Sequence, residues 1–145
     1  MELFPALRAL NIRFYAYNPL AGGMLTGRYR KGDDPSEGRF GGVTKGMYRP
    51  RYFKDQFFEG IELVRAACDT AGITMAKASM LWLTHHSQLS GGRNDGVIIG
   101  ASSQGHLDEN VDSCVSPDTL PEGVITAFDQ AWELCKPVCP KYFRP

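Results

Sequence analysis

The stretch that decides the fold is RFYAYNPLAGGMLTGRY, residues Arg13 to Tyr29. Its first part is a nearly continuous run of aromatic and small apolar residues, which predicts a strand over residues 12–17 that is buried in a parallel sheet. Pro19 disfavours helix at the preceding residue, and Gly22, Gly23 and Gly27 permit the positive φ angles that other residues resist. Such a loop can point backbone amides at the phosphates of a nucleotide. A plain turn after a strand explains the same composition.

Length and composition restrict the class of protein. A chain of 145 residues is long enough for one domain with a real core, but a closed (β/α)8 barrel needs about 250. With 43% hydrophobic and 22% charged residues the composition is that of a globular protein. The 16 basic residues balance the 16 acidic ones, so we expect no nucleic-acid partner and no membrane partner. Neither a membrane span nor a signal peptide is evident, which predicts a cytoplasmic protein.

The cysteines do not suggest a disulfide framework. There are four, and their spacing follows no disulfide pattern, so we interpret them as free thiols. Two of them, Cys135 and Cys139, can be drawn as a metal site with His85 and His86. The spacing does not follow a zinc pattern, and we therefore predict no metal.

The other helices and strands are predicted from the spacing of apolar residues and from capping residues at helix ends. The glycine-rich segment 28–48 contains few aliphatic residues, which predicts a long excursion without regular structure, of the kind that often acts as a lid. The other predicted elements are a helix at 2–10, a helix at 57–71 stopped by Gly72, a mostly buried helix at 75–86 capped by Thr74, a strand at 96–100, a helix from Ser102 or Ser103 to about 114 with Leu107, Val111 and Cys114 on one face, and a helix at 120–136.

This order predicts an α/β fold with a parallel sheet. Two strands cannot close a barrel or bury both faces of a sheet, so strands this apolar need neighbours that the chain does not encode. We therefore expect the C-terminal portion of a larger barrel. An open apolar strand edge also predicts self-association or binding to another partner.

Six short motifs are similar to one known family. They are ELFP at 2–5, NPLAGG at 18–23, MYRPRYF at 47–53, HHSQL at 85–89, VIIGASS at 97–103 and CPKYFR at 139–144. Together they resemble the C-terminal half of an aldo-keto reductase, in the branch of the aflatoxin-aldehyde and succinic-semialdehyde reductases. The resemblance implies that residues 1–145 are a partial domain of a (β/α)8 TIM barrel holding its seventh and eighth strands. It also implies NADPH-dependent reduction of an aldehyde or ketone.

The resemblance assigns the first loop to the cofactor. It implies that Tyr17 stacks on the nicotinamide ring, and that the segment from Asn18 to Gly22, including Leu20, lines the pyrophosphate. A flat aromatic ring at a strand end suits stacking because it offers area with few rotamers. A barrel-packing role for Tyr17 is the alternative.

The second loop is assigned to the adenosine end of the cofactor. Ser102 and Ser103 lie at a predicted helix N-terminus, which favours a phosphate, and His106 and Asn110 follow on the same helix. The resemblance implies that this face binds the 2′-phosphate and adenine, so that NADPH is preferred to NADH. His106 stands where the family pattern has Gln, which weakens that preference. Simple N-capping by a serine is the alternative.

The resemblance implies that two arginines, Arg51 and Arg144, bind the carboxylate of the substrate. A guanidinium suits this role because its two donors match the two carboxylate oxygens. The catalytic Asp, Tyr, Lys and His of the family belong to the first half of the barrel, and no residue here matches them. We therefore assign no catalytic residue, and we expect the isolated chain to be inactive. The alternative is a non-catalytic protein that binds a homologue or another partner.

Overall fold

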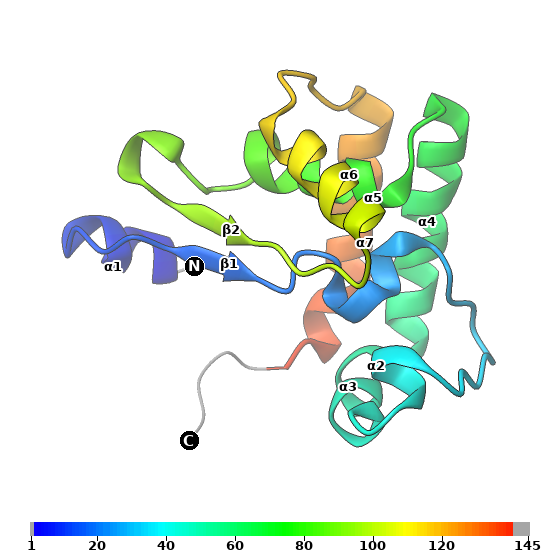
Figure 1. Ribbon diagram of the computed structural model, residues 1–145. Coiled ribbons are helices and arrows are strands. Elements are labelled where there is room, and N and C mark those ends of the chain that lie inside the picture. Colours follow the sequence, from blue (N-terminus) through cyan, green and yellow to red (C-terminus); the bar gives the residue numbers. More distant parts are fainter. Residues whose placement is uncertain (1, 141–145) are drawn as a thin grey trace.

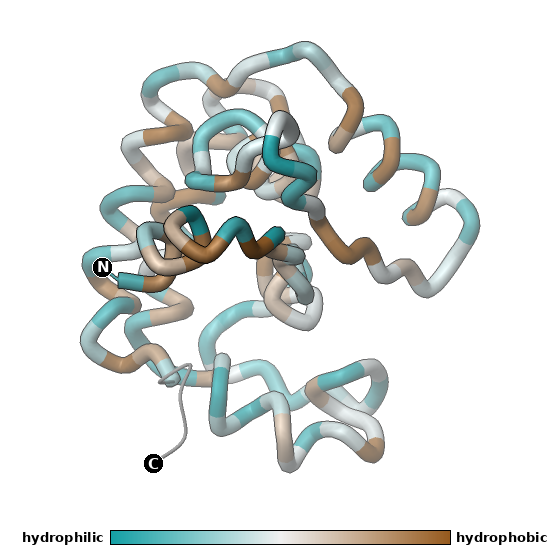
Figure 2. The backbone as a smooth tube through the Cα atoms, turned by 90° about the vertical axis from the view of Figure 1, so that its left-hand side faces the viewer, coloured by the Kyte–Doolittle hydropathy of each residue, from teal (hydrophilic) through white to brown (hydrophobic). Residues whose placement is uncertain are grey.

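The structure, a computed structural model, describes residues 2–140, and its fold is α/β with more helix than strand. The elements in chain order are α1 (Leu3–Ala9), β1 (Tyr15–Tyr17), η1 (Ala21–Thr26), α2 (Gly38–Gly41), α3 (Lys45–Tyr52), α4 (Asp55–Ala71), α5 (Met75–Leu81), η2 (Trp82–His86), η3 (Gly91–Arg93), β2 (Gly96–Ile98), α6 (Gln104–Val115), α7 (Glu122–Cys135) and η4 (Lys136–Val138). Figure 1 shows the sheet and α1 on one side of a body made of the other helices. The colours in Figure 2 show hydrophobic and hydrophilic residues alternating along the backbone of the helices.

The two strands form one parallel sheet, as predicted. Tyr15 pairs with Gly96 and Tyr17 with Ile98, so these four residues share one face of the sheet. The prediction that the strands are buried was wrong for that face, because the exposed fractions are 53% for Tyr15, 74% for Tyr17 and 55% for Ile98. A two-stranded sheet supplies one neighbour for each strand, which leaves a face and two edges uncovered.

An ion pair fixes the start of both strands. The carboxylate of Asp95, which is fully buried, accepts hydrogen bonds from both terminal nitrogens of Arg8 at 2.5 and 3.1 Å. It also accepts the backbone N–H groups of Phe14 at 2.8 Å and Ser90 at 2.9 Å. These bonds, the Arg8 side chain first, hold the pKa of Asp95 well below its usual range. One carboxylate therefore ties α1, β1 and β2 together.

The main core lies between α4, α5 and α7. Apolar side chains of α4 recur at helical period as predicted, and Ile61, Val64 and Cys68 are buried. Gly60 allows α7 to approach closely, because a Cβ there would lie 3.1 Å from the Cβ of Ala131. Gly72 ends α4 in a left-handed conformation with φ 65°, which confirms the predicted stop.

The helix after Gly72 agrees with its prediction with one local difference. Thr74 caps α5 by accepting the Lys77 N–H at 3.1 Å, and five of the seven residues of α5 are buried. The last turn, Trp82–His86, continues as a π-helix rather than as regular α-helix.

The expectation that 28–48 has no regular structure was wrong. Helix α2 and the first half of α3 lie in this segment, and Phe40 has no exposed surface. Its ring lies 4.9 Å from that of Tyr29 and 4.7 Å from that of Phe53, measured between centroids. Aromatic side chains from distant positions thus pack together in this part of the core. The prediction missed this packing because it relied on aliphatic residues, which are few in this segment.

Helix α6 turns a different face inward from the one predicted. Leu107 and Val111 are exposed, whereas Asn110 and Ser113 are buried. The buried polar atoms are satisfied locally, because Ser113 donates to the carbonyl of Glu109 at 2.6 Å. Helix α7 begins at Glu122 and ends at Cys135, close to the predicted bounds, and the 3₁₀ turn η4 accommodates Pro137.

We expect Phe40→Ala to destabilise the chain by roughly 3–5 kcal/mol, because it removes a fully buried ring from a packed cluster. Urea unfolding followed by circular dichroism measures this. Val43→Ala is the matched control in the same excursion, since Val43 is fully exposed, and it should change stability by less than about 0.5 kcal/mol. Equal effects of the two substitutions would contradict the packed excursion.

We expect Asp95→Asn to lower the urea midpoint at pH 7, because it removes the charge that Arg8 faces. The folded-state pKa of Asp95 lies below the unfolded one, so the carboxylate stabilises the fold above about pH 4 and this contribution is lost as the pH falls further. The difference between wild type and variant should therefore narrow from about pH 5 toward pH 2. Asp129→Asn, at an exposed position, is the control. A difference that does not depend on pH would contradict this account.

Candidate functional site

The two loops singled out by the sequence leave the same end of the sheet. One follows Tyr17 at the end of β1 and the other follows Ile98 at the end of β2, and the strands are parallel and in register. Figure 1 shows both loops running from the sheet toward the helical body. In parallel α/β folds, the carboxyl ends of the strands are the usual place for a site.

The loop after β1 is shaped by Asn18. This residue adopts a left-handed φ of 60°, and its side-chain oxygen accepts the Gly22 N–H at 2.9 Å. Gly22 and Gly23 have φ of 71° and 104°, so the predicted positive φ angles are confirmed.

The prediction that this loop points free amides at a phosphate was wrong for three of them. The N–H of Ala21 bonds to the carbonyl of Asn18 at 2.9 Å, and that of Gly23 to the carbonyl of Leu20 at 2.8 Å. The Gly22 N–H is taken by the Asn18 side chain. What this loop offers a ligand is therefore its side chains and remaining backbone groups. Tyr17 precedes the loop with most of its ring exposed, and Leu20 is half-buried.

The start of α6 brings three of the predicted residues together. Ser103 caps the helix, and its hydroxyl accepts the backbone N–H of His106 at 3.3 Å. The Oγ of Ser102 lies 3.1 Å from Nδ1 of His106. All three side chains are exposed. A helix N-terminus with two hydroxyls and an imidazole is an arrangement that accommodates a phosphate.

Asn110 lies on the same helix but is not part of the exposed group. It is 4% exposed, and its side-chain amide donates to the carbonyl of Gly100 at 3.4 Å. This bond ties α6 to the end of the strand segment. Its predicted contact with a cofactor stays a prediction.

Of the two predicted substrate arginines, one can be placed. Arg51 is half-buried in α3 and forms no hydrogen bond or ion pair with residues 2–140, so its guanidinium is available to a ligand. Arg144 lies outside the described residues. Its predicted role stays a prediction.

Sequence reasoning missed Tyr52, the neighbour of Arg51. Its hydroxyl accepts a hydrogen bond of 2.7 Å from the side-chain amide of Asn18. Burial raises the pKa of Tyr52, and the bond from Asn18 opposes that rise. No local pattern signals this contact, because the two residues are 34 positions apart.

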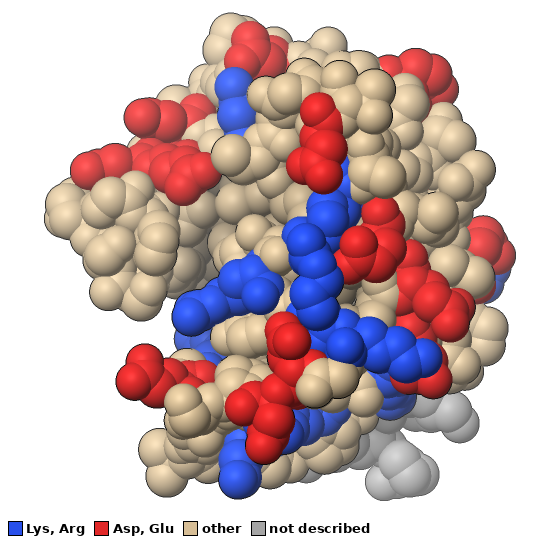
Figure 3. Space-filling model, turned by 90° about the vertical axis from the view of Figure 1, so that its right-hand side faces the viewer, with Lys and Arg blue, Asp and Glu red and all other residues tan. Residues whose placement is uncertain are grey.

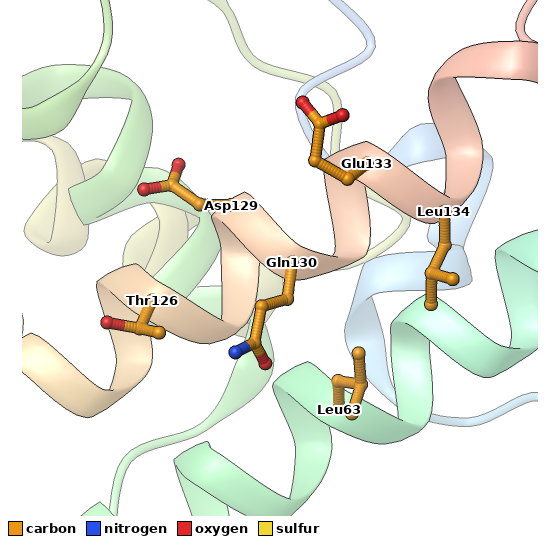
Figure 4. A pocket seen from close by; sticks show the side chains of 6 residues that line it. All are labelled: Leu63, Thr126, Asp129, Gln130, Glu133 and Leu134. Atoms are coloured by element: carbon orange, nitrogen blue, oxygen red, sulfur yellow. The ribbon is translucent and has the colours of Figure 1, made fainter.

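A groove between α4 and α7 holds none of the predicted site residues. It is lined by Leu63, Thr126, Asp129, Gln130, Glu133 and Leu134. Figure 4 shows Leu63 and Leu134 pointing toward one another across it. Figure 3 shows basic and acidic side chains interleaved on the face that it presents.

The cysteines and histidines do not assemble a metal centre within the described chain. Across residues 2–140, no group of three or more His, Cys, Asp or Glu side chains is placed to hold a metal ion. The cysteines are free thiols, and burial raises the pKa of Cys68 and of Cys135 to about 11. Within the same residues, no helix has the length and apolarity needed to cross a membrane.

Comparison with known proteins identifies the class. The aldo/keto reductase family matches residues 1–133, and the chain belongs to that family. It is 45% identical over 99% of its length to human aldo-keto reductase family 7 member A3 and, also at 45% over 99%, to rat aflatoxin B1 aldehyde reductase member 2. An aldo-keto reductase of the fungus Pseudocercospora fijiensis is 39% identical over 98% of the chain. The chain spans 45%, 41% and 49% of these relatives, less than half of each.

Proposed function

We propose that this chain forms the cofactor- and substrate-binding portion of an NADPH-dependent aldehyde or ketone reductase with a (β/α)8 barrel. The observation that carries the proposal is the family match together with the exposed Ser102, Ser103 and His106 at the start of α6. In this proposal β1 and β2 are two of the eight barrel strands, and their open edges pair with strands outside the 145 residues.

The exposed residues of the two loops bind different parts of NADPH. Ser103 and His106 hold the 2′-phosphate, where the helix dipole and a donor from the imidazole both favour negative charge. Tyr17 supports the nicotinamide with its exposed ring. Bound NADPH supplies the hydride that reduces the carbonyl carbon. The residues of this chain bind and orient, and the proton donor lies outside the sequence described here.

The substrate carries a carboxylate in addition to the carbonyl. Arg51 supports this, because it is a half-buried cation without a partner among residues 2–140. A bidentate contact with a carboxylate fixes the orientation of a small substrate more firmly than a single hydrogen bond does. The rat relative is, by its name, an aflatoxin B1 aldehyde reductase, which supports an aldehyde as the carbonyl substrate.

A second candidate function is binding without catalysis. The observation that favours it is the exposed face formed by Tyr15, Tyr17 and Ile98, beside two unpaired strand edges. Such a surface can pair with a second copy or with a homologue by strand addition. Activity and association measurements separate the two candidates.

We expect the chain to bind NADPH more tightly than NADH, and Ser103→Ala to reduce the NADPH affinity by about tenfold while leaving that for NADH unchanged. A hydrogen bond to a charged group is worth roughly 1.5–3 kcal/mol, and about 1.4 kcal/mol corresponds to tenfold. Isothermal titration calorimetry measures both affinities.

Ser116→Ala is the matched control, since Ser116 caps the opposite end of the same helix. It should leave both affinities unchanged. Equal affinities for NADPH and NADH in the wild type would contradict the assignment of the 2′-phosphate to this helix.

We expect the pure 145-residue chain to show no oxidation of NADPH with succinic semialdehyde, because no residue here matches the family's proton donor. Activity should appear when the chain is refolded together with the preceding segment of the rat reductase. Absorbance at 340 nm follows the reaction, and the rat segment alone is the control. Turnover by the pure chain would contradict the proposal that this chain binds the cofactor and substrate without supplying the proton donor. Self-association in sedimentation without rescued activity would favour the second candidate.

A further inference from the structure

Two segments far apart in sequence meet through one side chain. Asn18 accepts the Gly22 N–H with its oxygen at 2.9 Å and donates from its nitrogen to the Tyr52 hydroxyl at 2.7 Å. The first bond sets the shape of the loop after β1. The second joins that loop to the last residue of α3. Both polar ends of the Asn18 amide are thus used within the chain.

The packing around this bond is close. A Cβ on Gly22 would lie 2.8 Å from the ring of Tyr48, so the loop backbone rests against α3 where a larger residue would collide. The rings of Tyr48 and Tyr52 are stacked with centroids 6.0 Å apart. Displacing α3 would therefore disturb the loop, whereas the stack, which lies within α3, would move with the helix.

The groups on either side of the contact point to ligands. On the loop side, Asn18 directly follows Tyr17, which is largely exposed. On the helix side, Tyr52 directly follows Arg51, whose guanidinium has no partner among the described residues. Each member of the hydrogen-bonded pair is therefore one peptide away from a side chain assigned to a ligand.

We propose that Asn18 and Tyr52 are a positioning pair that couples the cofactor loop to the carboxylate-binding helix, so that a dinucleotide at one strengthens binding of a carboxylate at the other. The identity of the two ligands rests on the proposed function, whereas the mechanical link does not. This assigns Asn18 a role different from direct contact with the cofactor. Coupling of this kind is reciprocal, so the carboxylate must strengthen dinucleotide binding by the same factor.

The link is tested without ligands by amide hydrogen exchange in the 145-residue chain. Tyr52→Phe keeps the ring and deletes the acceptor of the Asn18 bond, so exchange of the Gly22 amide should accelerate roughly two- to tenfold, the size expected from one neutral hydrogen bond. Tyr48→Phe is the matched control on the same helix, because its hydroxyl accepts from Arg39 instead. It should leave the Gly22 amide unchanged. Equal exchange in wild type and Tyr52→Phe would overturn the link.

Asn18→Gly provides a second variant if Tyr52→Phe does not fold. Glycine accepts the left-handed φ of this position, so only the side-chain bonds are lost. Exchange across α3 should then accelerate as well, since the helix loses its tether to the loop. Unchanged exchange in α3 would also overturn the link.

The coupling of ligands is tested by titrating succinate in the absence and presence of saturating NADPH. In the wild type NADPH should raise the succinate affinity severalfold, and in Tyr52→Phe this factor should fall to about one, while Tyr48→Phe retains it. A factor unchanged by Tyr52→Phe would overturn the coupling. If neither ligand binds the wild type, the proposed function and the ligand coupling both fail, and hydrogen exchange alone decides the mechanical link.

Discussion

The buried carboxylate of Asp95 is the interaction on which the placement of both loops depends. It accepts hydrogen bonds from Arg8 in the last turn of α1, from the backbone just before β1 and from the backbone before β2. A carboxylate removed from water must be satisfied by such donors, because an unpaired buried charge is costly. Two segments that are far apart in sequence, residues 8–14 and residues 90–95, therefore converge on one side chain. Because the strands start together and run parallel in register, they also end together, and the two loops begin side by side. The ion pair therefore determines where the candidate site lies.

Below the sheet, stability comes from one continuous hydrophobic core, in which two clusters of side chains can be distinguished. The larger joins α4, α5 and α7 through aliphatic side chains, and the smaller gathers aromatic rings from the excursion around Phe40. The sheet contributes little to either cluster on its tyrosine-bearing face. A chain built in this way can keep its helices packed while the outer edges of β1 and β2 stay unpaired, which fits the proposed place of these strands in a barrel.

Features determined by neighbouring residues could be predicted from the sequence, whereas features determined by distant residues could not. Gly72, Thr74 and Ser103 act within one helical turn, and their predicted roles as stop and caps were confirmed. Helix α3 and the burial of Phe40 depend on rings from several segments, so composition alone predicted a loop. Leu107 and Val111 misled the prediction for α6 because its inner face is polar. For the site, the chain neighbours Ser102, Ser103 and His106 do come together, but the Asn18–Tyr52 bond has no local signature.

The contrast between Asn18 and Ser103 shows why a motif residue need not be a ligand. Both stand in the loops that follow the strands, and both are polar residues of the kind that binds phosphates. Ser103 keeps an exposed hydroxyl after capping its helix, and a hydroxyl can accept more than one hydrogen bond. Asn18 directs its oxygen and its nitrogen to partners within the chain, so a ligand would have to compete with both bonds. Its place in the loop is therefore best explained by geometry: Asn adopts the left-handed φ more readily than most residues, and its amide supplies an acceptor for Gly22 and a donor for Tyr52 at once.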